Sequence, residues 1–487
     1  MKMLFVIPKL KSQSGGKSLT VSPHLGVAYL SAFLKKNEIE VRVYDDGIEN
    51  NHVKLLSFIE EFNPDIIGIT VFSYCYNYAR DLVKILKNSS KSPLVLGGPH
   101  INIIKGQILI DTGAEFAIKH EGEHSLLELL KEIERGNADF KKVMGLIWKD
   151  HNGKIVENPD RPFMTDLDSL PFPGYEVFDI SKYFCYKDKM LPIITSRGCP
   201  FGCNFCSVRL CMGNGFRARS AKNVVQEIEH FVQKGWKNFA INDDCFTLNK
   251  QRAEEICDLI IGKKLNIGFQ FLNGIRADTV TLQLLKKMKS AGCFYISYGC
   301  ESGNDRILRV IKKNITREQV RNAVEWANAA NISNSVNFII GHTEETYQTA
   351  MDTIDFAKSL PTAFTNFYNL MPYPGTEAYE WVKQHGKFLV PAENYLENSI
   401  TLHGKPIFET SEFTREQREK VIKLGFGLYK LKYLQYRFGK VLGSLMFYLT
   451  KIKIIDKFAA FLILDTRLGK FIYTSICDLL CNPDRKR

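Results

Sequence analysis

The sequence predicts an α/β protein with a doubly wound, Rossmann-like parallel sheet, a partial (β/α)6 barrel of the TIM type and a helical C-terminal region. Residues 1 to about 137 alternate short β-branched runs with amphipathic helices. The alternation resumes at Leu191 for six further rounds, and beyond about residue 390 the pattern becomes helical. We therefore expect domains at 1–140 and 189–390, a hairpin and linker at 141–188, and a basic helical region at 391–487.

The first domain is expected to contain five strands connected by amphipathic helices. The strand candidates are "MLFVIP", "VRVYDD", "DIIGITVFS", "PLVLGG" and "FAIKHEG". Short connections between strands and helices are typical of a parallel sheet covered on both faces. Because ligands bind beyond the carboxyl ends of such strands, the candidate binding segments are "SPHLG", "FSYCYNY", "GGPH" and "EGEHS".

A hairpin and a linker are expected next. In "GLIWKDHNGKIVENP", the pair Asn152 and Gly153 suits the positive backbone angles of a tight turn. The stretch "RPFMTDLDSLPFPGYEVF" is rich in proline and aperiodic, which is typical of a linker. The domain boundary is therefore expected inside 160–185.

The second domain is expected to be the barrel. Its strand candidates are "LPIITS", "NFAINDD", "IGFQFLNG", "FYISYGCE", "SVNFIIG" and "FTNFYNLMP". Active sites of parallel barrels lie at the carboxyl ends of the strands. Cys199, Cys203 and Cys206 fall in the loop after the first of these strands.

Composition narrows the class of protein. The 487 residues are 45% apolar and 24% charged, as in ordinary globular proteins. The opening residues lack a signal-peptide pattern, so the cytoplasm is the expected compartment. Twelve cysteines in such a chain are not expected to form a disulfide framework.

The positive charge is concentrated in the tail. Residues 421–487 contain 13 Lys and Arg against 4 Asp and Glu, which gives +9 of the chain's net +12. The rest is nearly balanced, and this disfavours nucleic-acid binding along the whole chain. Lys and Arg interleaved with Phe, Leu and Tyr suit an anionic membrane interface or a lipid-like substrate. The alternative is a helical subdomain that closes the barrel mouth. The longest uncharged run, Val441–Thr450, is too short to span a bilayer.

Three explanations fit the C-x3-C-x2-C spacing of Cys199, Cys203 and Cys206. A closed four-thiolate site would add Cys211 and hold zinc or an electron-carrying cluster. Unrelated buried thiols are disfavoured because "SRGCPFGCN" has the composition of a loop. A [4Fe-4S] cluster on three thiolates would leave one iron open to a substrate or cofactor.

A cysteine motif in this position resembles that of the radical S-adenosylmethionine enzymes, and the resemblance covers residues 1 to about 385. In that family S-adenosylmethionine chelates the open iron, and its reductive cleavage gives a 5'-deoxyadenosyl radical. The resemblance implies that Cys199, Cys203 and Cys206 bind the cluster and that Phe205 lies near the adenine.

Further motifs extend the resemblance. "FRARS" resembles the R-x-R-S after the cluster loop, while "INDDCFTLN", "YGCESGND", "NFIIGHTEET" and "MPYPGTEAY" resemble the ends of the second, fourth, fifth and sixth strands. The fifth-strand motif departs from the family pattern at Asn337, which replaces a glycine, and at Thr343, where a proline is common. The S-adenosylmethionine contacts that this implies are Asn242, Asp243, Asp244, Glu301, Ile339, Gly341 and Glu344.

These charged residues also have plainer explanations. Asp243 and Asp244 suit a solvated strand end, and Glu301 suits a cap of the following helix. Arg217 and Arg219 suit surface charges.

The first domain resembles the cobalamin-binding domain of a radical S-adenosylmethionine subgroup, through "PHLGVAYLSAFL" and "LGGPH". The D-x-H-x-x-G motif, whose histidine coordinates cobalt in many cobalamin proteins, is absent, so the sequence identifies no axial ligand. Four histidines near the strand ends are either packing residues or ligands: His24, His100, His120 and His124. By their place at strand ends, the expected cobalamin contacts are Ser73, Tyr74, Gly97, Gly98 and Pro99.

The resemblance implies an enzyme that methylates an unactivated carbon of a small or lipid-like substrate, with a reductase, flavodoxin or ferredoxin as electron donor. The first alternative is radical cyclisation, oxidation or carbon–carbon coupling. An RNA methylthiotransferase would usually need a second cysteine trio in the first domain, where the sequence has only Cys75. An electron carrier would close its cluster with Cys211.

Overall fold

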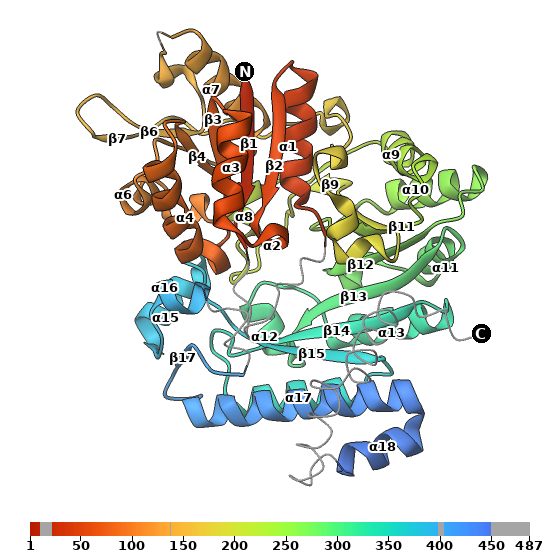
Figure 1. Ribbon diagram of the computed structural model, residues 1–487. Coiled ribbons are helices and arrows are strands. Elements are labelled where there is room, and N and C mark those ends of the chain that lie inside the picture. The colour runs from red at the N-terminus through yellow and green to blue at the C-terminus, as the bar shows by residue number, and fades with distance from the viewer. Residues whose placement is uncertain (10–21, 137, 398–403, 450–487) are drawn as a thin grey trace.

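The computed structural model describes residues 1–9, 22–136, 138–397 and 404–449. Two largely parallel sheets, each with its own flanking helices, lie side by side, and a long helix runs along the outer strand of the second sheet (Figure 1). The α/β class and the order of its parts are as the sequence predicts.

The first sheet has seven strands in the order β2-β1-β3-β4-β5-β6-β7. Its five parallel strands coincide with the predicted segments: β1 Lys2–Ile7, β2 Glu40–Asp45, β3 Ile66–Thr70, β4 Leu94–Gly97 and β5 Phe116–Ile118. The helices are α1 Leu25–Lys36, α2 Asp46–Glu49, α3 His52–Phe62, α4 Tyr76–Ser89, α5 Ile101–Ile104, α6 Gln107–Thr112 and α7 Glu123–Glu134. Buried side chains of α1 and α7 join one apolar core, and those of α3, α4 and α6 join another. Helices therefore cover both faces, as in a doubly wound sheet.

The predicted hairpin extends this sheet. β6 (Leu146–Lys149) pairs antiparallel with β5 and with β7 (Ile155–Glu157), so the hairpin is continuous with the first sheet. The Asp150 carboxylate accepts hydrogen bonds from the N–H groups of Asn152 and Lys154 at 2.9 and 2.8 Å. Only Gly153 of the predicted turn pair has a positive φ, 78°. The turn is therefore a wider loop organised by Asp150, not a two-residue turn.

The linker packs against both domains. It forms short 3₁₀ turns, and Tyr175 and Tyr183 are buried in the core that α1 shares with the barrel helices. The Tyr183 hydroxyl donates to Asp45 at the end of β2, at 2.7 Å. The aromatic residues of this proline-rich stretch thus fix the first domain against the second.

The second sheet has six parallel strands in the order β15-β14-β13-β12-β11-β8. They are β8 Met190–Ile193, β11 Asn238–Ile241, β12 Gly268–Ile275, β13 Cys293–Glu301, β14 Ser333–Ile340 and β15 Phe364–Asn369. Each lies on a predicted segment. Within the described residues β8 and β15 do not pair with each other, so the barrel is partial. A separate two-stranded ribbon joins β9 (Ser196–Arg197) and β10 (Arg217–Ala218).

The barrel helices begin at polar caps. They are α8 Val208–Met212, α9 Ala221–Gln233, α10 Lys250–Gly262, α11 Leu282–Ser290, α12 Asp305–Val310, α13 Arg317–Ala329 and α14 Tyr347–Ser359. The side chains of Ser220, Asn249, Thr281, Thr316 and Thr346 each accept a hydrogen bond from the first turn of the helix that follows. Such caps satisfy N–H groups that have no partner within a helix.

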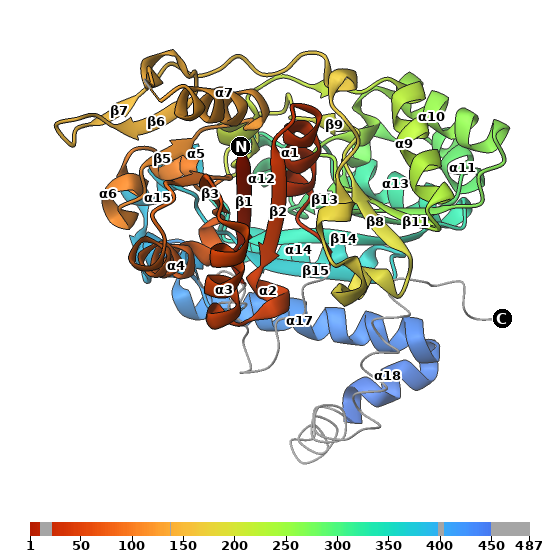
Figure 2. The same cartoon turned by 45° about the horizontal axis from the view of Figure 1, so that its top comes forward.

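The C-terminal region consists of α15 Glu377–His385, β16 Lys387–Phe388, α16 Ala392–Glu397, β17 Phe408–Glu409, α17 Arg415–Phe438 and α18 Lys440–Leu449. Figures 1 and 2 show α17 running along β15, with α18 folded back at its end. A Cβ on Gly425 would lie 2.5 Å from the Phe367 ring, so the glycine allows α17 to approach β15 closely. No helix among the described residues is long and apolar enough to cross a membrane. The part of the predicted basic tail beyond residue 449 lies outside the described residues.

Candidate active site

The cysteine loop follows β8 and is fixed by hydrogen bonds to three neighbouring segments. Cys199, Cys203 and Cys206 are free and partly exposed. Gly198, with φ of 83°, donates its N–H to the Asp244 carboxylate at 3.0 Å. The Asn204 N–H donates to the Ile311 carbonyl at 3.1 Å, and the Ala378 N–H donates to the Asn204 carbonyl at 3.0 Å. The loop is therefore braced from the second, fourth and sixth strand ends.

The donor set fits a cluster better than a single ion. Among the described residues, no three His, Cys, Asp or Glu side chains lie close enough together to hold one metal ion. A zinc site would need such a group, whereas each thiolate of a [4Fe-4S] cluster binds a different iron. The Cys211 thiol lies against the Pro99 carbonyl of the first domain at 3.8 Å. This position disfavours Cys211 as a fourth ligand.

The three thiols have different surroundings. A hydrogen bond from the buried Cys245 thiol lowers the pKa of Cys199. Burial raises the pKa of Cys206 to about 11 and also raises the pKa of Cys203, although Lys313 and Arg276 oppose the latter shift. Cationic groups beside the loop favour thiolates. No pattern in the sequence marks Cys245 as a neighbour of Cys199, because a contact across the loop has no local signal.

The second-strand acids brace the cluster loop. Asp243 is 3% exposed, and its carboxylate accepts hydrogen bonds from the Thr195 N–H at 2.6 Å, the Thr195 hydroxyl at 2.5 Å and the Ser196 hydroxyl at 2.6 Å. Asp244 holds Gly198, as described above. The Asn242 carbonyl accepts from Asn273 at 3.1 Å. The explanation of Asp243 as part of a solvated strand end is therefore wrong. Its carboxylate bonds a backbone N–H and two hydroxyls of the residues that follow β8.

Glu301 lies at the end of β13 in a left-handed conformation with φ of 75°. It is 9% exposed and pairs with the buried Lys313 at 3.0 Å. The helix that follows is capped by Asn304 instead, so the helix-cap explanation of Glu301 is wrong. A non-glycine residue in this conformation, held by a buried ion pair, is typical of a functional site.

Phe205 and the residues at the end of β14 form another side of the site around the cysteine loop. The Phe205 ring lies 5.3 Å from the His342 ring, and His342 is 1% exposed. Ile339 packs beside Phe205 in the apolar cluster under α15 and α16. Gly341 has φ of 97°, and a Cβ there would lie 2.2 Å from the Arg418 guanidinium. Their contact with S-adenosylmethionine stays a prediction.

The two glutamates after β14 have opposite environments. Glu344 lies at the surface and pairs with Arg306 at 3.2 Å. Glu345 is 2% exposed, and its carboxylate accepts the N–H groups of Gly341 at 2.5 Å and His342 at 3.2 Å. Burial raises the pKa of Glu345 to about 7, although the Arg418 guanidinium from α17 opposes the shift. The sequence motif names Glu344, whereas no local pattern marks Glu345 or Arg418.

The strand ends of the first domain present small and aromatic groups. The Ser73 hydroxyl bonds the His100 ring at 3.0 Å, and the Tyr74 ring stacks on Phe72 at 5.0 Å. A Cβ on Gly97 would meet nothing within 4 Å, whereas one on Gly98, with φ of 108°, would lie 2.7 Å from the Val71 carbonyl. Gly98 is thus required by the backbone, and Gly97 borders open space.

The expected cobalamin segments contain an unused polar atom. His100 is 3% exposed, and its Nε2 has no hydrogen-bond partner among the described residues. Burial lowers the pKa of His100 to about 4, so the ring is neutral. Buried polar atoms are rarely unpaired in a folded protein. An orphaned imidazole nitrogen and an open glycine in the same strand-end segment fit a site that a large cofactor completes.

Buried ion pairs join the two domains next to the cluster loop. Arg197 bonds Glu121 at 2.9 Å and Glu123 at 2.7 Å, and Arg217 bonds Glu121 at 2.7 Å. Arg219 is 5% exposed and pairs with the buried Glu227. Burial would raise the pKa of Glu121, but the guanidiniums outweigh it and hold that pKa below its usual value. The surface-charge explanation of Arg217 and Arg219 is therefore wrong.

Contacts between side chains and backbone groups also join the first domain to the rest of the chain. The His120 ring lies 3.2 Å from the Cys211 carbonyl, while the Cys211 thiol contacts Pro99. The Asn77 N–H donates to Glu397 of α16 at 2.7 Å. The strand ends of the first sheet thus lie against the cysteine loop and the C-terminal region.

Comparisons with known proteins agree with this arrangement. Residues 193–357 match the model of the radical SAM superfamily, and residues 15–130 match that of the B12 binding domain. A relative from Pyrococcus horikoshii, named uncharacterized methyltransferase PH0819, is 32% identical over 88% of this chain and 92% of its own length. The chain belongs to the radical SAM family. Within that family, the chain belongs to the cobalamin-dependent members.

Two further proteins are similar to the chain. The anaerobic magnesium-protoporphyrin IX monomethyl ester cyclase of Rubrivivax gelatinosus is 28% identical over 78% of this chain and 70% of its own length. The structure of the cobalamin-dependent radical enzyme OxsB, with aqua-cobalamin and S-adenosylmethionine bound, has a TM-score of 0.69 and 17% identity, and covers 98% of this chain and 75% of that one. The OxsB likeness confirms the fold.

The cofactors of this radical SAM protein are a [4Fe-4S] cluster, S-adenosylmethionine and cobalamin. The thiols of Cys199, Cys203 and Cys206 suit the cluster, and the strand ends of the first sheet suit cobalamin. The protein is an enzyme, and the family resemblance found in the sequence is confirmed.

Proposed function

We propose that this radical SAM enzyme transfers a methyl group to an unactivated carbon of a small or lipid-like substrate. The observation that carries the proposal is the contact between the cysteine loop and the first domain, where Cys211 meets Pro99 and Arg197 meets Glu121 and Glu123. This contact supports one shared space at the carboxyl ends of both sheets. A substrate there would lie within reach of both cofactors.

The cluster, S-adenosylmethionine and cobalamin supply a hydrogen-abstracting radical and a transferable methyl group when bound. Around these cofactors, side chains of the protein are proposed to fix the positions of the reacting groups and to exclude water. The buried pair Glu301–Lys313 and the Phe205 ring are proposed to contact S-adenosylmethionine, together with Asn242, Asp244, Ile339 and Gly341. Asp243 and Glu345 are proposed to act as positioning residues, because their carboxylates hold backbone N–H groups of the surrounding loops.

The first domain is proposed to hold cobalamin without a protein ligand to cobalt. Ser73, Tyr74, Gly97, Gly98 and Pro99 remain the proposed contacts. The neutral, buried His100 bonds the Ser73 hydroxyl and is proposed to position that side chain for the cofactor.

Anaerobic reconstitution with cobalamin, S-adenosylmethionine and a reductant tests the proposal. We expect both 5'-deoxyadenosine and S-adenosylhomocysteine to form, and a metabolite of the host extract to gain the mass of one methylene unit. Methyl transfer releases S-adenosylhomocysteine, whereas cyclisation or oxidation does not require this product. A reconstituted enzyme that releases 5'-deoxyadenosine without it would contradict methylation.

Radical cyclisation is the second candidate, favoured by the similarity to the protoporphyrin ester cyclase over 78% of this chain. A cyclase or oxidase would release 5'-deoxyadenosine and convert a substrate to a product that has lost hydrogen. The same mass spectrum therefore separates the two reactions.

We also propose that α18 and the end of α17 lie against a membrane or a lipid-like substrate. Large apolar side chains are exposed there: Phe438 at 44%, Val441 at 86%, Leu442 at 51%, Leu445 at 56% and Tyr448 at 63%. Apolar side chains beside Lys440 and Arg437 suit an anionic interface. In co-sedimentation with phosphatidylglycerol vesicles, we expect Leu442→Asp/Leu445→Asp to reduce binding. Equal binding of the variant and the wild type would contradict the proposal.

A further inference from the structure

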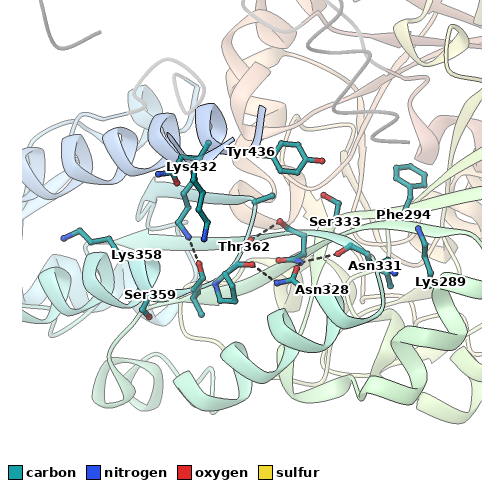
Figure 3. Close-up of a pocket in the computed structure, with 17 residues that line it drawn as sticks. Lys289, Phe294, Asn328, Asn331, Ser333, Lys358, Ser359, Thr362, Lys432 and Tyr436 are labelled. Carbon is teal, nitrogen blue, oxygen red and sulfur yellow. Dashed lines mark hydrogen bonds between the residues drawn. The ribbon is translucent and has the colours of Figure 1, made fainter. Parts of the chain in front are cut away.

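A second cavity lies at the opposite end of the barrel from the cysteine loop. Its volume is about 780 Å³. Figure 3 shows its lining, which comes from the residues just before β14 and β15, the start of β13, and the end of α17. The cysteines follow the carboxyl end of β8, whereas this cavity borders the amino ends of β13, β14 and β15. A ligand here would not reach the reaction space.

The cavity lining is positively charged. Four lysines contribute to it, Lys289, Lys358, Lys432 and Lys440, and no Asp or Glu does. Lys358 pairs with Asp355 at 2.8 Å. For the other three, no carboxylate of the described residues lies within ion-pair distance. The field inside the cavity therefore favours an anion.

Lys432 is the most buried of these lysines. It is 8% exposed, and its Nζ donates one hydrogen bond to the Leu360 carbonyl at 2.7 Å. An ammonium group has three donors, so two remain for a ligand or water. A buried charge without a counter-ion is costly, and burial lowers the pKa of Lys432 to about 8. An anion in the cavity would remove this cost.

The floor of the cavity also contains an unpaired acceptor. Asn334 is 1% exposed, and its Nδ2 donates to Asn328 at 2.8 Å. Its Oδ1 has no hydrogen-bond partner among the described residues. The Asn328 amide in turn donates to the Pro361 carbonyl at 2.7 Å. A ligand that satisfies this floor must therefore carry a hydrogen-bond donor, such as a hydroxyl, as well as an anionic group.

We propose that this cavity binds a phosphate ester of a small polyol, with Lys432 on the phosphate and Asn334 on a hydroxyl, while Lys289, at the other end of the lining, adds to the positive field (Figure 3). The same chemistry occurs in a free sugar or glycerol phosphate and in the headgroup of phosphatidylglycerol. The exposed apolar residues Val441 and Leu442 follow Lys440 at the rim, so both sources can enter. The inference is independent of the reaction at the cluster.

The test uses the full-length protein with sn-glycerol 3-phosphate in titration calorimetry, and with phosphatidylcholine vesicles with and without phosphatidylglycerol in co-sedimentation. Lys432→Met keeps the length of the stem and removes the charge. Lys289→Met removes a partly exposed charge and guards against misfolding of the first variant. Lys286→Met is the control, because Lys286 is exposed on the same helix as Lys289 but does not line the cavity.

We expect Lys432→Met to bind at least tenfold more weakly than the wild type, Lys289→Met to bind more weakly by a smaller factor, and Lys286→Met to bind as the wild type does. Loss of glycerol phosphate binding identifies a free ester as the ligand. Loss confined to the phosphatidylglycerol vesicles identifies the lipid headgroup. If Lys432→Met and Lys289→Met behave like Lys286→Met toward both probes, the proposal is overturned.

Discussion

The carboxyl ends of the two parallel sheets face one another but present different chemistry. The barrel presents charged side chains that are fixed by specific bonds, such as Asp243 on Thr195 and Glu301 on Lys313. The first sheet presents glycine, aromatic rings and the unpaired nitrogen of His100. Preorganised charges suit a small polar cofactor such as S-adenosylmethionine. Flat, open strand ends suit a broad ring such as cobalamin.

The largest effect is expected at the cysteines. Cys203→Ala should abolish the visible absorption of the reconstituted cluster and the formation of 5'-deoxyadenosine, because the cluster then loses one of its three thiolate ligands. Cys211→Ala is the control, since its thiol contacts Pro99 of the first domain. It should keep both signals. Loss of the cluster in Cys211→Ala would support the closed four-thiolate site of an electron carrier.

The next largest effect is expected where the two sheets are joined. Arg197→Met removes the ion pair of Glu123 and one of the two ion pairs of Glu121, which keeps Arg217. Removing one side of a buried ion pair typically costs about 3–5 kcal/mol, so thermal unfolding should begin well below that of the wild type. Lys35→Met removes an exposed pair with Glu176 and should cost about 0–1 kcal/mol. Similar losses in the two variants would show that the junction contributes no more than a surface pair.

Glu344 and Glu345 follow the fifth barrel strand, β14, and allow an exposed and a buried carboxylate of the barrel to be compared. Glu345→Ala should cost about 1–3 kcal/mol for each of the Gly341 and His342 N–H groups left unpaired. Glu344→Ala should change stability by about 0–1 kcal/mol, because its ion pair is exposed. Denaturant unfolding of the two variants measures both. Equal effects would contradict the positioning role of Glu345.

Glu345 should also give a pH signature. Burial raises its pKa from 4.5 to about 7. A carboxyl whose pKa rises on folding stabilises the fold fully below its unfolded pKa, and the contribution is lost as the pH rises through the folded pKa. Relative to Glu345→Gln, which does not titrate, the wild type should therefore lose stability between about pH 4.5 and pH 7. A constant difference between the two unfolding curves across that window would contradict this assignment.

The sequence predicts what is local and periodic. All eleven parallel strands fall on predicted segments, because each is a short apolar run between turn signals. The cysteine trio is predicted by its spacing within one loop. The contacts of Arg197 with Glu121 and of Arg418 with Glu345 join segments that are distant in the sequence. No residue spacing therefore predicts them. Glu344 matches the motif, but it has φ of 58° and lies at the surface. The buried carboxylate after this strand belongs to Glu345 instead.

The smallest predicted effect tests the open edge of the first sheet. A Cβ on Gly97 would meet no protein atom within 4 Å, so Gly97→Val should leave the unfolding temperature nearly unchanged while its branched side chain enters the proposed cobalamin space. We expect cobalamin to bind roughly tenfold more weakly, a change of about 1.4 kcal/mol, as measured by retention of its visible absorption after gel filtration. The matched variant is Gly98→Val, whose Cβ would collide with the Val71 backbone at 2.7 Å; it should lose stability whether or not cobalamin is present. If Gly97→Val retains cobalamin as well as the wild type does, the cofactor lies away from this strand end.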